Sequence, residues 1–285
     1  MITLSGKHPA SKLAVLATLL AAVVAASFAL GRLSRPEGGT REHRAGTRAA
    51  EVQLQFMRPG QLEAAARAFP VVYVPFGLIE WHGKHLPLGN DALKAHGILV
   101  RTAEMYGGVV YPPVYFHEGF GRDALLPVLE ELFGRLKKMG FRVIIGVSGH
   151  NVQEQIDLID RALQKAVADG TVAGAAFWEI SLSMGQFSST DHAAKWETSN
   201  MMVLYPDLVK MSELGTGPLA PDMKPPDGIG GYDPRVHASV EAGRLNIELA
   251  AESFGMKARE LLESLPEENR SFGLPRVSPE FWWSI

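Results

Sequence analysis

The sequence predicts an α/β protein with a three-layer α/β/α domain and a mostly parallel sheet, preceded by an N-terminal hydrophobic segment. Short apolar runs rich in β-branched residues, such as 71–76, are bounded by proline or glycine and predict buried strands. Longer segments between them, such as 124–139, have apolar residues at helical spacing. Strands that alternate with helices predict a parallel sheet covered by helices on both faces. Such sheets carry their sites at the carboxyl ends of the strands.

Local signals define the individual elements. Gly77 bounds the strand at 71–76, and Asn90 or Asp91 can cap the helix that follows it. Gly140 can end a later amphipathic helix. We expect strands over 71–76, 109–111, 141–147 and 173–180, and helices over 59–68, 91–105, 124–139, 197–205 and 236–265, with one more helix ending near 168.

Composition and charge narrow the class of protein. The 285 residues are 46% hydrophobic and 21% charged, which is ordinary for a globular protein with a sizeable core. A formal net charge of -3 argues against a nucleic-acid partner, because nucleic-acid-binding surfaces are basic. The absence of cysteine excludes disulfides and thiolate chemistry. Cysteine content therefore gives no indication of the compartment.

An almost continuous apolar run covers residues 13–30. Its length approaches the about 20 residues that cross a bilayer and exceeds the apolar core of most signal peptides. We therefore expect a signal peptide or signal anchor over 1–31, a flexible tether over 32–50, and the main domain over 51–285. A buried core helix is the alternative, but the run has no periodic polar face. We expect the protein to be anchored to the inner membrane if the segment is uncleaved, and to be exported if it is cleaved. The periplasmic side is expected rather than the cytoplasm.

The segment 77–91 concentrates the polar side chains that can carry chemistry. In an extended backbone, Glu80 and His82 point to the same side, and Asp91 can reach the same point after a turn. Carboxylates and an imidazole in one place predict a divalent-metal site. The alternative is a polar loop that ends in a helix cap. Because His150 follows another predicted strand, both clusters fall at the same edge of the sheet.

These motifs resemble those of the creatininase (creatinine amidohydrolase-like) family. Its hallmark, Glu-x-His-Gly-x-His-Leu-Pro-Leu-x-x-Asp, is matched without a gap by residues 80–91. Its Asn-Gly-His-Gly-Gly-Asn motif is altered at 148–153, and its His-Ala-Gly-x-x-Glu-Thr-Ser motif is matched in part at 192–199. A weaker glycine-rich motif lies at 228–234. The resemblance covers roughly residues 55–265, with the motifs in the right order.

The resemblance implies a domain that holds two divalent metal ions (zinc, manganese or iron) and often assembles as a homohexamer. It implies that Asp91 bridges the ions and that His192 transfers a proton. For the last carboxylate ligand we choose Glu197, with Glu154 in reserve, because Val152 stands where some members have a carboxylate. The full set of implied metal ligands is Glu80, His82, Asp91, His150 and Glu197. His85 either contacts metal or orients its neighbours by hydrogen bonds.

The implied activity is hydrolysis of a C–N bond in a small cyclic or linear amide, through a water activated by the two metals. The altered residues 151–153 and a short 114–123 segment are expected to reshape the pocket, so creatinine itself is not the expected substrate. His117 and Glu118 either line that pocket or belong to a solvated loop. A catalytically lapsed member that serves as a binding or assembly protein is the alternative. A dimetal hydrolase of esters or phosphates is disfavoured, because no glycine-rich phosphate loop is present.

Overall fold

Strand β1 (Val71–Ile79) is the centre of a parallel sheet and is buried along almost its whole length. The computed structural model describes residues 50–117, 119, 121–183, 191–220 and 222–274. Within this part, β1 pairs with β4 (Val143–Ser148) on one side, and β4 pairs with β5 (Ala173–Trp178). On its other side β1 pairs first with β2 (Val109–Val110) and then with β3 (Val114–His117).

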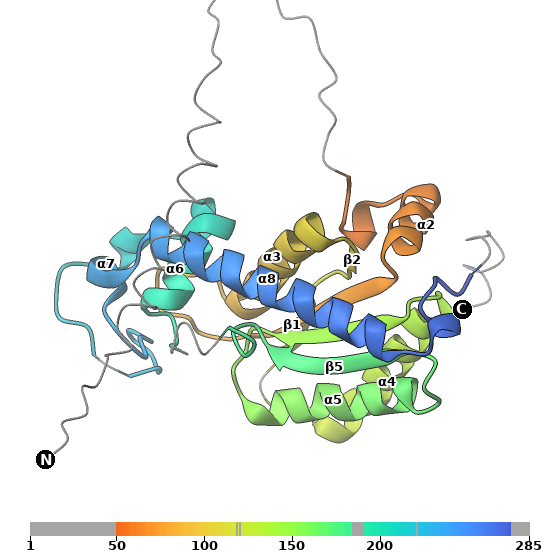
Figure 1. Cartoon of the computed structure of the whole chain (residues 1–285). Coiled ribbons are helices and arrows are strands. Elements are labelled where there is room, and N and C mark those ends of the chain that lie inside the picture. The colour runs from red at the N-terminus through yellow and green to blue at the C-terminus, as the bar shows by residue number, and fades with distance from the viewer. Residues whose placement is uncertain (1–49, 118, 120, 184–190, 221, 275–285) are drawn as a thin grey trace, which may run out of the picture. The chain divides into compact units, whose positions relative to one another are not determined.

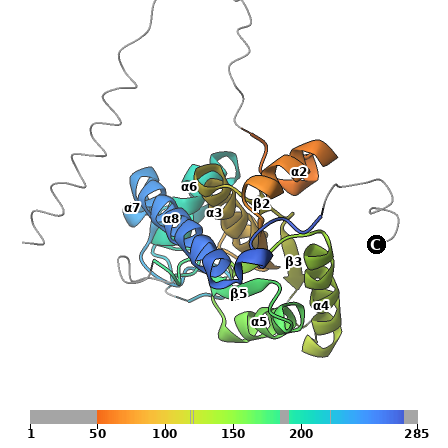
Figure 2. The same cartoon turned by 45° about the vertical axis from the view of Figure 1, so that its right-hand side comes forward.

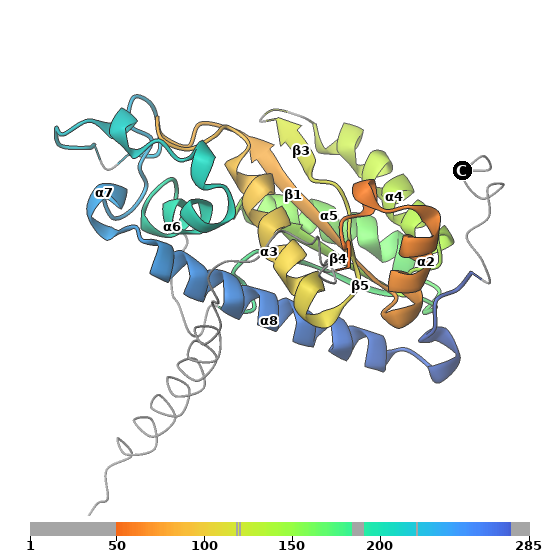
Figure 3. The same ribbon diagram turned by 90° about the horizontal axis from the view of Figure 1, so that it is seen from above.

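Helices cover both faces of this sheet, as the alternation of strands and helices predicts (Figures 1 and 2). On one face, alternate β1 side chains such as Val74 and Phe76 pack against helices α4 (Arg122–Lys138) and α5 (Gln153–Val167). On the other face, Tyr73 packs against α3 (Asn90–Tyr106) and α8 (Val240–Ser264), which lie side by side (Figure 3). The three-layer α/β/α architecture is therefore confirmed.

The remaining elements are one further helix before the sheet, one further helix after β5, and several short helices. Helix α2 (Pro59–Ala68) occupies the predicted 59–68. Helix α6 (Lys195–Leu204) contacts both α3 and α8. A smaller apolar cluster joins it to the loops, through residues such as Leu86, Met201 and Ile229. The other short helices are η1 (Leu54–Phe56), η2 (Pro206–Leu208), η3 (Met211–Leu214), α7 (Pro234–His237) and η4 (Glu267–Asn269).

Several predicted boundaries are wrong. The single helix expected over 236–265 is interrupted, because Ala238 and Ser239 are extended and Ser239 Oγ accepts a hydrogen bond from the Ala242 N–H at 3.1 Å, which begins α8. The 114–123 segment contains strand β3, whose four residues show no alternating pattern that predicts a strand. Neither Asn90 nor Asp91 caps α3, since the cap residue is Gly89.

The predicted N-terminal hydrophobic segment and nearly all of the predicted tether fall within residues 1–49, which lie outside the described residues. Glu118 also lies outside the described residues. Among the helices that are described, none is both long and apolar enough to cross a membrane.

Candidate active site

The five candidate metal ligands come from four separate segments and meet at the carboxyl edge of the sheet. Strands β1 and β4 run in parallel toward the same edge, where Phe76 pairs with Ser148, the last residue of β4, and β1 continues to Ile79. The side chains that follow these strands therefore face those at the starts of α3 and α6. Glu80 and His82 follow β1, Asp91 lies in the first turn of α3, His150 follows β4, and Glu197 lies in the first turn of α6.

Two glycines allow the start of α3 to approach both strands. A Cβ atom added at Gly77 would lie 2.2 Å from the Ala92 backbone nitrogen, and one added at Gly149 would lie 2.0 Å from the Asp91 carbonyl oxygen. Real Cβ atoms do not approach other atoms so closely. The absence of a side chain at both glycines therefore allows Asp91 to lie beside the strand ends. Gly77 also continues β1, in which it pairs with Tyr115, rather than ending the strand as predicted.

Replacing Gly149 by alanine is expected to destabilise the protein and to separate His150 from Asp91. The added methyl group must displace backbone atoms, which costs about 1–3 kcal/mol or more. A lower melting temperature and a lower metal content per chain would confirm this. Gly134→Ala is the matched control, because no atom lies within 4 Å of its added Cβ. A Gly149→Ala protein with wild-type melting temperature and metal content would contradict the expectation.

Asp91 directs its two carboxylate oxygens toward two different imidazoles. Its Oδ1 lies 3.0 Å from His82 Nε2, and its Oδ2 lies 3.4 Å from His150 Nδ1. Oδ2 also accepts a hydrogen bond from the Leu78 backbone N–H at 3.3 Å. Burial would raise the pKa of this carboxyl, but hydrogen bonds with the two imidazoles hold it far below its usual range. Asp91 is thus a fixed carboxylate between two candidate ligands.

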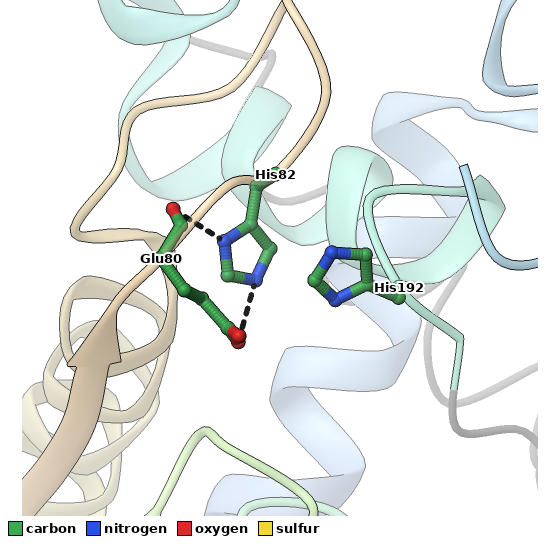
Figure 4. A group of neighbouring side chains, drawn as sticks. All are labelled: Glu80, His82 and His192. Carbon is green, nitrogen blue, oxygen red and sulfur yellow. Dashed lines mark hydrogen bonds and ion pairs between the residues drawn. The ribbon is translucent and has the colours of Figure 1, made fainter. Parts of the chain in front are cut away.

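His82 is fully buried, and its ring presents one nitrogen to carboxylates. Nδ1 donates to the Glu80 backbone carbonyl at 3.3 Å, because a carbonyl can only accept (Figure 4). Nε2 lies 3.5 Å from Glu197 Oε2 and 3.7 Å from Glu80 Oε1, besides Asp91. Burial alone would lower the pKa of His82, but the surrounding carboxylates, Glu197 first, raise it to about 9. The Nε2 position therefore favours a proton or a metal cation.

His150 also presents one ring nitrogen to carboxylates, but it lies nearer to solvent than His82. Its Nδ1 lies 3.0 Å from Glu80 Oε1, and its side chain is about one-fifth exposed, at 21%. Burial would lower the pKa of His150, but hydrogen bonds with Asp91 and Glu80 raise it to about 10. Here too, oxygens converge on a nitrogen that must carry a cation or a proton.

The ligand atoms form two triads that share Asp91. We call Glu80, Asp91 and His150 the outer triad, and His82, Asp91 and Glu197, which are all buried, the inner triad. Within each triad the ligand atoms lie within 4.8 Å of one another. Imidazole nitrogens mixed with carboxylate oxygens suit zinc, manganese or iron. The residues present therefore fit a pair of divalent metal ions.

A buried lysine, which the sequence reasoning missed, lies directly behind the inner triad. The fully buried Lys94 ammonium donates to Glu197 Oε1 and lies 2.8 Å from Glu179 Oε1, directly after β5. Burial would raise the pKa of Glu197, but Lys94 and His82 lower it, whereas burial raises the pKa of Glu179. Lys94 thus contacts two buried carboxylates, of which Glu197 is the one that belongs to the inner triad.

His192, the candidate for proton transfer, stacks on His82 with ring centroids 4.4 Å apart (Figure 4). Its Nε2 donates to the Trp81 carbonyl at 2.7 Å, so Nδ1 is the nitrogen that can accept or donate a proton. A ring nitrogen of His192 also lies within 4.8 Å of ligand atoms of Glu80 and His82. The contact with Trp81 thus fixes the ring beside the candidate ligands.

Asp191, next to His192, was another residue that the sequence reasoning missed. Its carboxylate accepts hydrogen bonds from the backbone N–H groups of Trp196 and Glu197, at 2.6 and 3.1 Å. These contacts fix the first turn of α6 and therefore the position of Glu197. Burial and the charge of Glu197 raise the pKa of Asp191 to about 6.

A pocket of about 560 Å³ opens over the outer triad. The pocket is lined by four of the five candidate ligands, all but the buried His82, and by other residues that include Trp81, Asn151, Val152, His192, Met223 and Lys224. Asn151 and Val152 therefore place side chains at the site, as expected from the altered 151–153 segment.

Three other predicted residues lie elsewhere. The reserve ligand Glu154 lies in the first turn of α5, in a neighbouring pocket with His117, and belongs to neither triad. His85 belongs to neither triad either. Its Nε2 contacts Thr198 Oγ1 at 2.8 Å, in agreement with the orienting role rather than with metal contact.

Residues 55–256 match the model of the creatininase family, described as creatinine amidohydrolase. The chain belongs to the creatininase family. It is accordingly a metal-dependent hydrolase of carbon–nitrogen bonds other than typical peptide bonds.

Two characterised relatives have different substrates. The creatinine amidohydrolase of Pseudomonas putida is 26% identical over 233 residues, which are 67% of this chain and 89% of the relative. A mycofactocin precursor peptide peptidase of Mycolicibacterium smegmatis is 32% identical over 169 residues, which are 53% of this chain and 65% of the relative. Membership of the family therefore leaves the substrate open.

Solved creatininase structures share the fold. One creatinine amidohydrolase structure has a TM-score of 0.60 at 20% identity and covers 74% of this chain and 98% of its own. A structure described as "Creatininase Mn" has a TM-score of 0.58 at 21% identity, with coverages of 73% and 98%. A variant creatininase of the "Zn-Zn type" is similar, with a TM-score of 0.56 at 21% identity, covering 73% of this chain and 97% of its own.

Proposed function

We propose that the chain hydrolyses a C–N bond of a small cyclic or linear amide with two divalent metal ions. The observation that carries the proposal is the sharing of Asp91 by the outer and inner triads, with one carboxylate oxygen toward each imidazole. Known relatives support a metal-dependent reaction, since creatininases are described with Mn and with Zn.

Two bound ions would supply Lewis acidity, which lowers the pKa of water and polarises a carbonyl. The chain's own residues then have separate tasks. Asp91 would hold both positions, and Glu80 and His150 would complete the outer one beneath the pocket. His192 Nδ1 would move a proton to the leaving nitrogen, because its Nε2 is occupied by the Trp81 carbonyl.

Metal analysis and turnover test this function together. The full chain, loaded with Mn²⁺, is expected to hold about two ions and to hydrolyse a member of a panel of lactams, formamides and linear amides. A chain that takes up no metal would contradict the proposal. Retained metal without turnover, accompanied by shifts in melting temperature with panel compounds, would instead indicate a family member that kept only its binding function.

Replacing His192 by glutamine is expected to slow turnover of a panel substrate by about 10²–10⁴-fold, since this is the usual contribution of a positioned acid or base. The KM and the metal content are expected to stay unchanged. His237→Gln is the matched control, because His237 is exposed on α7. A His192→Gln enzyme that loses metal as well as activity would show that His192 acts as a ligand, and would contradict its role in proton transfer.

A further inference from the structure

A lysine with no exposed surface is unusual, and Lys94 lies in contact with a candidate ligand of the inner triad. Burying an ammonium group requires compensation by opposite charge. Here Glu197 Oε1 and Glu179 Oε1 supply it, from helix α6 and from the end of β5. The exposed fractions of the three side chains are 0%, 7% and 2%, so water contributes little to screening of these charges.

The two carboxylate oxygens of Glu197 have different partners. Oε1 accepts from Lys94, whereas Oε2 accepts from the Ala193 N–H at 2.7 Å and faces His82 Nε2. A carboxylate oxygen has two lone pairs, so Oε2 can accept the N–H and also contact an ion. The Ala193 contact and the first turn of α6 hold Oε2 in place independently of Lys94.

The outer and inner triads therefore differ in charge. Each has one imidazole and shares Asp91, and each adds one glutamate. The glutamate of the inner triad, Glu197, faces a permanent ammonium group, whereas the contacts of Glu80 are with His150 and His82. A fixed positive charge close to a cation site repels the cation, and this repulsion is strong in a buried environment.

We propose that Lys94 is a fixed internal cation that weakens ion binding at the inner triad. The chain then holds one ion tightly at the outer triad and a second, exchangeable ion at the inner triad. This inference rests on the proposed function, because it requires both triads to take up metal.

The test removes the ammonium group and keeps the buried charge balanced. Lys94→Met alone would leave Glu179 and Glu197 buried without their counter-charge and can fail to fold. The double variant Lys94→Met/Glu179→Gln removes one positive and one negative group while preserving side-chain size. Lys165→Met/Glu130→Gln is the matched control, because it makes the same two replacements in an ion pair between α4 and α5, where Lys165 is 69% exposed.

Each full-length protein is stripped of metal and titrated with Mn²⁺, with the same pH for all proteins. The heat of binding is measured by calorimetry, and the number of bound ions per chain is determined. The wild type is expected to show two steps, and the Glu197→Gln variant is expected to lose the weaker one. In the double variant the weaker step should tighten by about ten-fold or more, because the removed ammonium group contacts the candidate ligand Glu197, whereas the removed Glu179 carboxylate belongs to neither triad. The control pair should leave both steps unchanged.

Two equal steps in the wild type, or a weaker step that is unchanged or weakened further in the double variant, would overturn the role of Lys94 and leave the proposed function intact. One ion in the wild type and two in the double variant would support the role in its extreme form. A wild-type chain that binds no Mn²⁺ would overturn both proposals.

Discussion

Replacing Asp91 by asparagine is expected to release both metal ions and to lower amide hydrolysis by about three orders of magnitude, or roughly 4 kcal/mol. The reason is that each Asp91 oxygen faces a different imidazole, so one substitution removes a charge from the outer and inner triads together. Substitution of Glu80 or Glu197 removes a ligand from only one triad and should leave about one ion per chain.

The fold should survive this change. Asparagine has the size of aspartate and retains an oxygen that can accept from the Leu78 N–H. Metal content by elemental analysis, turnover and the circular dichroism spectrum would be compared with those of Asp123→Asn. That control makes the same replacement in the first turn of helix α4, at an exposed position. An Asp91→Asn protein that keeps two ions would refute the shared-carboxylate arrangement.

Much of this site could be predicted, because its signals are local. The apolar run 71–76 predicts a buried strand, and residues two apart after it point to one side, which relates Glu80 to His82. His150 follows a second predicted strand. Since parallel strands end at one edge, these residues had to come close to each other.

Other parts of the site depend on tertiary contacts that no local pattern contains. Lys94 comes three positions after Asp91 in a predicted helix, so the two residues lie on the same helix face. This spacing was the one feature of the sequence that could have indicated a position for Lys94 near the site. That its ammonium group would meet Glu179 and Glu197 depends on how β5 and α6 pack. Asp191 likewise lies outside regular elements, and its role appears only through its contacts with α6.

Metal binding is expected to tighten steeply as the pH rises, because each triad contains one imidazole that is protonated in the metal-free protein. The pKa of His82 is raised to about 9 and that of His150 to about 10. Metal ligation requires neutral imidazole, so each ion displaces about one proton near pH 7. Each binding constant should therefore rise about ten-fold per pH unit, or about 100-fold between pH 6 and 8.

The metal-free chain should show the opposite dependence. Since the folded-state pKa values lie above the ordinary value of about 6.5, the stability due to these two imidazolium groups is complete below that pH. It is lost as the pH rises through about 9 and about 10, when the protons leave. The melting temperature of the stripped protein should therefore fall over this range, while added Mn²⁺ should restore it.

Titration with Mn²⁺ at pH 7, in two buffers of different ionisation enthalpy, would count the released protons directly. His237→Gln is again the control, because an exposed histidine outside the triads should leave the count unchanged. Glu197→Gln should reduce the count by about one, because the inner triad then no longer takes up its ion. A binding constant that is independent of pH between 6 and 8 would mean that neither His82 nor His150 gives up a proton to metal, and the assignment of both as ligands would fail.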